Sequence, residues 1–454
     1  MPAASPTMPE PPLSALAHIP GTDGWPLLGV TLQMLADPKG VTERFARKYG
    51  PVFRANSFGG RVVLLLGPEA NEFVLMDQAK LFSSQHGWER IFGRLFPGGL
   101  LLMDFDEHRL HRKALSVAFK AGALRSYLES LNSGIAANVS RWLRSSADLR
   151  CYPALKQMTL DLAAAAFLGE GMGADTERVK RAFIDMVAAT VAVVRIPLPG
   201  TQMKAGVEAR RLMIEFFSRQ IAARRESCSQ DVFTQLCKTI TEDGRLLTAR
   251  EIADHMSFLM MAAHDTLASS LSSFVYFLAF NPAWQEKLRA EIMALGPYPP
   301  GEPLPYERLD DLRLTEMVFN ESMRLIPPAP AIRRCAVRDT EFAGFRIPRG
   351  TRVAVNPLFT HRMPEFWPEP ERFDPLRFSD EAIRARHKYA FIPFGGGAHM
   401  CLGQRFAYMQ AKCFAYHLLS AAHVSVRSNY QPEWSYWPIP RPRDGLQVTL
   451  TSLG

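Results

Sequence analysis

The longest regular pattern in the chain is a helical one that covers residues 252–280. Thr248 and Glu251 form an N-terminal capping box just before it, and an Asn-Pro pair ends it. A helix of about 30 residues spans about 45 Å, and this one is apolar nearly all round, which indicates a buried helix. His264 and Asp265 in its middle argue against a transmembrane helix. We therefore expect a large, mainly α-helical unit whose core can bury a cofactor.

Composition restricts the class of protein further. The 454 residues are 47% hydrophobic and 22% charged, which is normal for a globular protein, and no linker, repeat or charge block divides them. The net charge of +8 comes from basic residues spread along the chain, so we expect no nucleic-acid partner. Six cysteines without a CxxC pair fit neither a zinc site nor a disulfide framework.

The N-terminal segment is rich in proline and lacks the apolar stretch of a signal peptide or a membrane anchor. We expect residues 1–17 to be a flexible tail and residues 18–454 to form a single domain. The cysteine usage fits a reducing compartment, so a cytoplasmic location is expected. We also expect the protein to be a monomer.

Shorter patterns place other elements around the long helix. Residues 37–49 predict a helix, and two strands follow it around the Gly59-Gly60 turn. Residues 82–104 are predicted to be an apolar, loop-rich region of the kind that covers a binding site. Two long helices, at residues 175–194 and 203–225, are joined by an apolar Pro/Gly turn, and we interpret them as a lid.

A glycine-rich loop near the C-terminus carries the strongest chemical signal. Phe394 ends a short apolar run, three glycines follow it, and Cys401 falls where the loop becomes a helix. Glycine allows the backbone to turn tightly and to approach a flat group closely. The unpaired N–H groups and the positive end of a helix favour a thiolate at such a place. One sulfur there suits a redox-active metal centre, and a glycine turn with an ordinary buried cysteine is the alternative.

Two charged pairs lie at helical spacing. His108 and Arg112 are four residues apart and therefore share one face of a helix. Glu321 and Arg324 are three apart and can form a charge-assisted pair, which Arg372 from a later Pro-rich loop can join. Each pair alone is weak evidence for a functional site, because helices hold many such pairs.

The middle of the long helix holds an acid next to an alcohol, Asp265 and Thr266. A threonine hydroxyl can bond to the carbonyl four residues earlier and loosen the helix locally, and Asp265 is a candidate proton carrier. The alternative is a solvated or ion-paired aspartate beside a threonine that only satisfies its own helix.

Taken together, these motifs resemble those of the cytochrome P450 family of haem-thiolate monooxygenases. FGGGAHMCLG, residues 394–403, matches the haem-binding signature Phe-x-x-Gly-x-Arg/His-x-Cys-x-Gly. ESMR matches the Glu-x-x-Arg pair, PERF supplies Arg372, AAHDT matches the oxygen-activation motif, and HRLHR matches the haem-contacting helix. The resemblance covers about residues 19–453 in family order. It implies the mainly α cytochrome P450 fold, a large helical domain with a long central helix over the haem and small β-sheets.

The resemblance implies a haem b cofactor and a role for each motif around it. Cys401 would be the axial thiolate of the iron, with Phe394 packed near its sulfur and Gly403 in the loop whose N–H groups approach that sulfur. The two haem propionates would accept charge-assisted hydrogen bonds from His108, Arg112, Arg334 and His399.

The remaining motifs are implied to support the chemistry from two sides. The Glu-x-x-Arg pair and Arg372 would form a buried network that braces the loop of Cys401. Asp265 and Thr266 would relay protons during oxygen activation. One residue departs from the family pattern, since Ala263 stands where the family usually has glycine. Altered oxygen access or slightly poorer coupling is the expected effect of its methyl group.

The residues expected around the substrate are mostly apolar, which predicts an apolar substrate. They are Trp88, Phe92, Phe258, Ala262, Ala329, Ile332 and Trp437. Several stretches, among them GWPLLGVTLQMLAD and PIPRPRDGLQV, resemble the retinoid-hydroxylating branch of the family found in cyanobacteria and animals. An isoprenoid-type lipid, such as a retinoid or terpenoid, is therefore the first expectation, with a fatty acid or a sterol as the alternative.

Electrons are expected from outside the chain, from a ferredoxin and its ferredoxin reductase. The ferredoxin would dock on the face of Cys401, where Arg405 and Lys412 add positive charge. A peroxide-driven haem-thiolate enzyme and a haem sensor without turnover are the other hypotheses. Asp265 and Thr266 argue against both, because peroxide users tend to lack that relay and a sensor does not need it.

Overall fold

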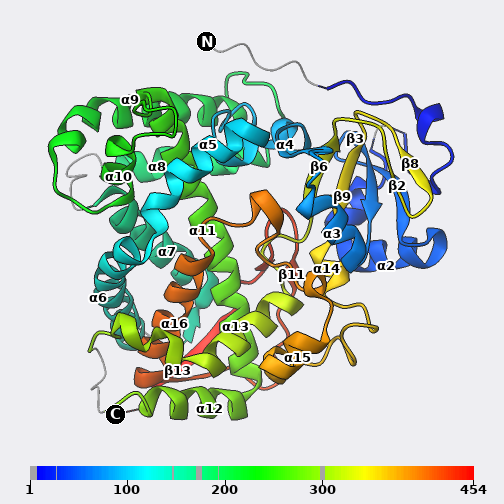
Figure 1. Cartoon of the computed structure of the whole chain (residues 1–454). Coiled ribbons are helices and arrows are strands. Elements are labelled where there is room, and N and C mark those ends of the chain that lie inside the picture. Colours follow the sequence, from blue (N-terminus) through cyan, green and yellow to red (C-terminus); the bar gives the residue numbers. More distant parts are fainter. Residues whose placement is uncertain are drawn as a thin grey trace.

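The long central helix forms as α11, Ala249–Phe280, in the computed structural model of the chain, and other helices surround it (Figure 1). The expected capping box is present, because the Glu251 N–H donates to the Thr248 hydroxyl and the Thr248 N–H donates to the Glu251 carboxylate. Side chains along most of α11 are buried, as its apolar pattern predicts. The structure describes residues 8–26, 28–145, 148–169, 176–192, 194–296 and 302–453.

Helices from both halves of the chain pack on α11 and share one large apolar core with it. The most extensive of these contacts are those of α11 with α7 and α9. α13 and α16 also pack on α11, and α16 follows the C-terminal glycine-rich loop. The helices that contribute to this core are α5 (Phe105–Ser116), α6 (Ala121–Ser145), α7 (Cys151–Leu168), α8 (Thr176–Thr190), α9 (Gln202–Glu226), α10 (Val232–Lys238), α12 (Pro282–Met293), α13 (Arg313–Leu325) and α16 (Gln404–Ala421).

Strands gather on the right of Figure 1, where six of them form a sheet in the order β1-β2-β3-β9-β6-β4. They are β1 (Gly21–Thr22), β2 (Val52–Ser57), β3 (Gly60–Leu65), β4 (Phe82–Ser83), β6 (Ile332–Ala336) and β9 (Arg352–Val355). β2 and β3 are the hairpin predicted around the Gly59-Gly60 turn. The smaller sheets are formed by β5 (Asp148–Arg150), β7 (Thr340–Phe342), β8 (Phe345–Ile347), β10 (Ala422–Ser425), β11 (Trp434–Ser435), β12 (Arg441–Pro442) and β13 (Gln447–Ser452). The prediction of a mainly α protein with small sheets is confirmed.

Helices cover both faces of the six-stranded sheet. On one face α1 (Thr31–Ala36) and α2 (Pro38–Tyr49) pack against alternate residues of β2 and β3, such as Phe53 and Leu64. On the other face α3 (Pro68–Met76) packs against the residues between them, such as Val52 and Val63. This alternation follows from the two-residue period of a strand. The short helices α14 (Pro357–Thr360) and α15 (Asp380–Ala385) lie in the connection that follows β9.

Two predictions about the N-terminal third need correction. Residues 82–104 are more regular than expected, because α4 (Ser84–Phe92) forms there, with the Ser83 hydroxyl accepting the His86 N–H at its N-cap. The tail boundary at residue 17 is too late, since Leu16 is buried and Glu10 forms an ion pair with Arg352. Residues 1–7 of the expected tail lie outside the described residues.

The two helices interpreted as a lid are α8 and α9, which lie side by side and contact each other extensively. Residues 170–175, including the expected first residue of that pair, and residue 193 lie outside the described part. The turn between the helices exposes large apolar side chains, with Ile196 61% and Leu198 54% accessible. Within the described residues, none of the helices combines the length and the apolar character needed to cross a membrane.

Candidate active site

The loop that carries Cys401 is held in place by backbone contacts. The Cys401 N–H donates to the Phe394 carbonyl at 2.9 Å, which closes the loop on itself. Gly397 has a φ of +62°, and a Cβ atom there would collide with the Leu75 carbonyl oxygen. Only glycine therefore allows the loop to pass this close to the end of α3. α16 starts at Gln404, so Cys401 lies at the predicted transition from loop to helix.

Opposing influences set the pKa of the Cys401 thiol. Burial is the largest influence and raises the pKa of the thiol above its ordinary value, while the Gly403 N–H and the positive charge of Arg112 oppose part of that rise. Cys401 nevertheless keeps accessible surface, so protein atoms surround the residue on some sides and leave it open on another. A sulfur in this position can bind a metal ion, because the Gly403 N–H and Arg112 both stabilise its thiolate form.

Basic side chains from three separate segments meet above this loop. The rings of His108, on α5, and His399, in the cysteine loop, lie 3.8 Å apart between centroids. Both lie close enough to Arg112 and Arg334 for those positive charges to lower their pKa values. Burial is the larger cause, and it brings the pKa to about 4 for His108 and about 2 for His399. Both imidazoles are therefore neutral near pH 7.

One polar group of this cluster lacks the partner that buried groups normally have. His108 is 2% exposed, and its Nε2 atom has no hydrogen-bond partner in the described part of the chain. Arg334 is 4% exposed, and its guanidinium donates to the Arg333 carbonyl at 2.8 Å. Burial lowers its pKa to about 10, and the negative charges of Asp104 and Asp77 oppose that shift, so an additional anion beside it would further stabilise its charge. Haem fits this arrangement, because its iron binds a thiolate and its two propionates supply acceptors for neutral histidines and arginines.

The predicted Glu321–Arg324 pair is confirmed as a fully buried ion pair on α13. Arg324 Nε donates to one carboxylate oxygen at 2.6 Å and Nη2 donates to the other at 2.8 Å. The remaining guanidinium hydrogens go to backbone carbonyls, among them that of Arg372 at 3.1 Å. Burial raises the pKa of Glu321, and Arg324 and Arg377 oppose that shift.

The prediction that the Arg372 side chain joins this pair is wrong. Its guanidinium is 60% exposed and bonds to Glu369, so only its backbone carbonyl reaches the network. The third charged group is Arg377, whose Nε lies 3.5 Å from Glu321 and whose side chain is 11% exposed. The sequence contains two similar stretches here, PERF and PLRF, and the second carries the arginine that turns inward.

The acid–alcohol pair on α11 is engaged with neighbouring groups. The Thr266 hydroxyl donates to the Ala262 carbonyl at 2.6 Å, as the helix-loosening interpretation predicts. Asp265 forms an ion pair with Lys156 of α7 at 2.9 Å. Ala262, Asp265 and Thr266 keep accessible surface within an otherwise buried helix, so this segment faces an open region. Its role as a proton relay stays a prediction.

Aromatic side chains connect α4 to α11 beside this segment. Trp88 lies 5.6 Å from Phe92 between ring centroids, Phe92 lies 6.3 Å from Phe96, and Phe96 lies 6.3 Å from Phe258. Three of the residues predicted to line the substrate pocket are thus joined through Phe96, which lies in the same predicted apolar region.

Other predicted pocket residues lie further along the chain. Ile332 comes within 3.8 Å of the Cβ position of Gly395 in the cysteine loop, and Ala329 is half-buried in the connection before β6. Trp437 stacks on Phe58 of the sheet at 4.2 Å, and no described interaction joins it to the aromatic residues of α4 and α11.

The positive surface expected for a ferredoxin is smaller than predicted. Arg405 is exposed at the start of α16. Lys412 is not available, because it is 5% exposed and its ammonium pairs with Glu316 at 2.7 Å. The Lys412 part of the docking prediction is therefore wrong, since the helix turns that side chain toward α13.

Comparisons with known proteins agree with this geometry. The family model described as Cytochrome P450 matches residues 19–449. The putative cytochrome P450 136 of Mycobacterium tuberculosis is 37% identical over 446 residues, which are 97% of this chain and 90% of the relative. The putative cytochrome P450 120 of Synechocystis is 31% identical over 447 residues, 97% of this chain and 98% of the relative.

A solved structure extends the likeness to the fold. Retinoic acid-bound cyanobacterial CYP120A1 matches with a TM-score of 0.87 and 31% identity, over 98% of this chain and 100% of that one. The thiolate loop, the basic cluster above it and the acid–alcohol helix occur together in a chain that matches the family model over nearly its whole length. The chain therefore belongs to the cytochrome P450 family of haem-thiolate monooxygenases.

Proposed function

We propose that the protein uses haem b, dioxygen and external electrons to hydroxylate an apolar, isoprenoid-type small molecule. The observation that carries this proposal is the basic cluster around Cys401, with its unpartnered His108 Nε2 and buried Arg334. These groups match an anionic, planar cofactor whose metal binds sulfur. When bound, the haem supplies the reduction of dioxygen and the oxidation of a C–H bond.

The residues of the chain would bind and orient the reactants. Cys401 would hold the iron, and the basic cluster would hold the two propionates. Thr266 would keep its hydroxyl toward the open side of α11, and Asp265 would carry protons inward from the side of Lys156. The Glu321–Arg324–Arg377 network would hold the cysteine loop against α13.

The substrate class rests on the apolar side chains and on one relative. Trp88, Phe92 and Phe258 present aromatic surface near α11, which suits a hydrocarbon rather than a polar metabolite. The related cyanobacterial structure was solved with retinoic acid, an isoprenoid acid. A fatty-acid or sterol substrate is the alternative within the same chemistry. We further propose a ferredoxin and ferredoxin reductase as electron donors, with Arg405 on the docking face.

The first test is spectroscopic. The reduced carbon-monoxide complex should show the strongly red-shifted Soret band of thiolate-ligated haem. Cys401→Ser should abolish this band, whereas Cys228→Ser, at an exposed cysteine, should retain it. A histidine-type Soret band in undamaged wild-type protein would refute Cys401 as the ligand.

The second test separates the reaction classes. A panel of retinoids, terpenoids, sterols and fatty acids is screened for the change in spin state that follows displacement of water from the iron. The best binder is then incubated with ferredoxin, its reductase and NADPH. Oxygen-dependent hydroxylation is expected, whereas product formed only with peroxide, or binding without turnover, would contradict a monooxygenase.

A further inference from the structure

Arg195 follows α8, the first of the two helices interpreted as a lid, and its guanidinium bonds to the ends of two helices. Nη1 donates to the carbonyl of Thr190, the last residue of α8, at 2.5 Å. Nη2 donates to the carbonyls of Arg90 and Ile91, in the last turn of α4, at 2.7 Å each. One side chain thus joins the lid to the helix that carries predicted pocket residues.

The three carbonyls are of a kind that a helix leaves without partners of its own. The last four carbonyl groups of an α-helix have no N–H group one turn further on to bond with. The negative end of the helix dipole lies at the same place, so a cationic donor is favoured there. Because a guanidinium has five N–H donors in one plane, Arg195 can serve α4 and α8 at the same time.

The rest of the connection between α8 and α9 is weakly attached. Large apolar side chains are exposed along it, at Val191, Val194, Ile196 and Leu198. The Thr201 hydroxyl donates to the Leu198 carbonyl at 2.7 Å, which is a bond within the connection itself. Among the described residues of this connection, 191–192 and 194–201, Arg195 alone makes hydrogen bonds to α4.

The surroundings of Arg195 allow these bonds to break without leaving a buried charge unpaired. Burial lowers the pKa of Arg195, and so does the positive charge of the exposed Arg94. No carboxylate in the described part of the chain forms an ion pair with Arg195, so neutral carbonyls hold it against a like charge. When the guanidinium leaves, water can solvate both the cation and the three carbonyls.

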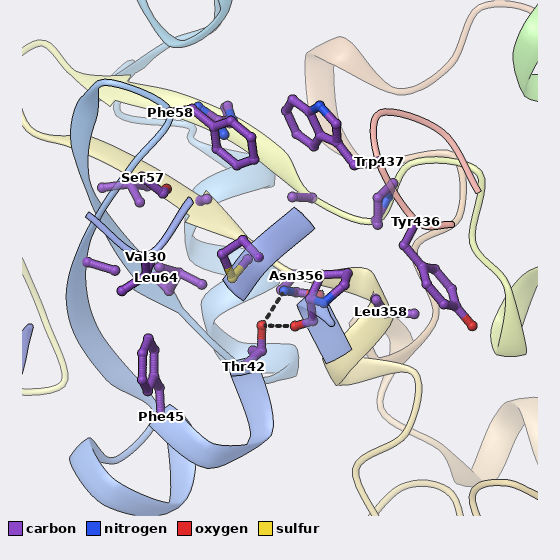
Figure 2. A pocket seen from close by; sticks show the side chains of 18 of the residues that line it. Val30, Thr42, Phe45, Ser57, Phe58, Leu64, Asn356, Leu358, Tyr436 and Trp437 are labelled. Atoms are coloured by element: carbon purple, nitrogen blue, oxygen red, sulfur yellow. Dashed lines mark hydrogen bonds between the residues drawn. The ribbon is translucent and has the colours of Figure 1, made fainter. Parts of the chain in front are cut away.

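The opposite side of α4 is anchored without the lid. Arg90 Nη1 donates to the carbonyl of Gly59, in the β2–β3 turn, at 3.1 Å. The neighbouring Phe58 stacks on Trp437 at 4.2 Å between ring centroids, beside the cavity shown in Figure 2. A Cβ atom at Gly87 would come within 2.8 Å of the backbone of β6, so α4 lies directly on that strand. α4 therefore stays on the sheet when the lid moves away from it.

The contact between the lid and the end of α4 lies beside the aromatic residues of the site. Phe92, the last residue of α4, is one link of the aromatic series that ends at Phe258 of α11. A Cβ atom at Gly206 of α9 would lie 3.1 Å from Leu95, so the second lid helix packs against the residues just after α4. Separation of the lid from α4 would therefore open a path along these residues toward α11.

We propose that Arg195 is a latch, a positioning residue that sets how fast large apolar molecules reach and leave the open side of α11. While the guanidinium bonds to both helix ends, the lid stays against α4. When it is released, the lid moves and a large molecule passes, whereas a molecule as small as imidazole needs no release. The latch rests on the haem site of the proposed function, but not on the identity of the substrate.

The test compares two ligands of the haem-loaded protein by stopped-flow recording of the Soret band. Clotrimazole is a bulky, neutral azole, and imidazole is a small one. Arg195→Met should speed both association and dissociation of clotrimazole at least fivefold, change its Kd less than threefold, and leave the imidazole rates unchanged. A side chain that touched the ligand would change the Kd instead.

Two further variants make the result specific. Arg195→Lys should give clotrimazole rates between those of wild type and Arg195→Met, because an ammonium keeps the charge but lacks the planar set of donors that bonds to both helices. Arg181→Met, at an exposed arginine of α8, should leave all rates unchanged. Unaltered melting temperatures would show that each variant is folded.

Amide hydrogen exchange of the same proteins tests the latch without relying on the haem. Arg195→Met should raise exchange at least fivefold in the last turns of α4 and α8, and leave the β2–β3 hairpin unchanged. Unchanged clotrimazole rates, unchanged exchange, or equal acceleration of clotrimazole and imidazole would each overturn the latch. If imidazole did not shift the Soret band of the wild type, the proposed haem site would fail, and hydrogen exchange would still decide on the latch.

Discussion

Arg377 and Arg372 are five residues apart in one irregular, Pro-rich segment, yet they have different surroundings. Arg377 lies against the buried Glu321 carboxylate, whereas Arg372 lies at the surface beside Glu369. We expect Arg377→Met to lower the free energy of unfolding by about 2–4 kcal/mol, because it leaves a buried carboxylate with one cation fewer. Arg372→Met should cost at most about 0.5 kcal/mol, because its carbonyl remains in place.

Urea unfolding of the two haem-loaded variants checks this prediction, with the Soret band recorded in parallel. Arg377→Met should also release haem at a lower urea concentration than wild type. Equal midpoints for the two variants would show that Arg377 contributes no more to the network than a surface arginine does.

At Thr266, the proposed role in proton transfer can be tested without disturbing the residues proposed to hold the haem. Its hydroxyl is bonded to the Ala262 carbonyl, so Thr266→Ala removes one hydrogen bond but no element of the haem cluster. We expect this variant to keep haem and substrate binding while a larger share of electrons ends in hydrogen peroxide. Thr266→Ser, which keeps the hydroxyl, should remain close to wild type. The ratio of product to NADPH consumed measures the effect, and an unchanged ratio in Thr266→Ala would remove Thr266 from the relay.

The glycine loop before α16 contains two glycines with different requirements. Gly397 has positive φ and no room for a Cβ, whereas a Cβ at Gly403 meets its nearest neighbour, Phe119, only at 4.0 Å. Gly397→Ala should therefore displace the loop from α3 and abolish most of the red-shifted Soret band. Gly403→Ala keeps the N–H that faces the Cys401 sulfur, so it should retain that band and lose less than about 1 kcal/mol of stability. Haem content per chain measures both, and loss of haem in Gly403→Ala alone would reverse the assignment.

Elements with strong local patterns were predictable from the sequence, and those that depend on distant contacts were not. The α11 helix and its capping box follow from residues within a few positions of each other. Helix α4 did not, because it is short and contains a glycine, and it packs against β6 and the short helix at Leu100–Leu102. Lys412 was predicted to add positive charge to the surface, but in the structure it forms an ion pair with Glu316 of α13. Arg372 and Arg377 could not be told apart, since the backbone path between them decides which one turns inward.

Across the whole molecule, the family motifs predicted which residues gather around Cys401. They did not predict the contacts between the β2–β3 hairpin and the loop before β12. Cys401, His108 and His399 belong to motifs of the family, and the structure brings the two histidine rings together as the resemblance predicts. Arg333 and Phe58 belong to none of the motifs, and their relation to Trp437 arises only when the sheet brings both ends of the chain together.

Buried histidines outside the cysteine loop make the stability of the whole fold depend on pH. Burial lowers the pKa to about 3 for His255, which contacts His111 at 2.9 Å, and to about 4 for His417, which contacts Asn132. Their pKa in the unfolded chain is about 6.5. As the pH falls below 6.5, the unfolded state binds protons that the folded state refuses, so stability is lost from there down to the folded pKa values.

Each of these two histidines should cost about 1.2 kcal/mol of stability between pH 6 and pH 5, because a shift of one pKa unit corresponds to about 1.4 kcal/mol. The double variant His255→Gln, His417→Gln should therefore lose about 2 kcal/mol less than wild type over that interval. Between pH 7 and pH 8 the difference should fall to about 0.3 kcal/mol for the pair, since the unfolded histidines are then mostly unprotonated. Urea unfolding at each pH measures the slopes. Parallel slopes below pH 6 would mean that these histidines become protonated in the folded protein, which would require water to enter the core beside α11 and α16.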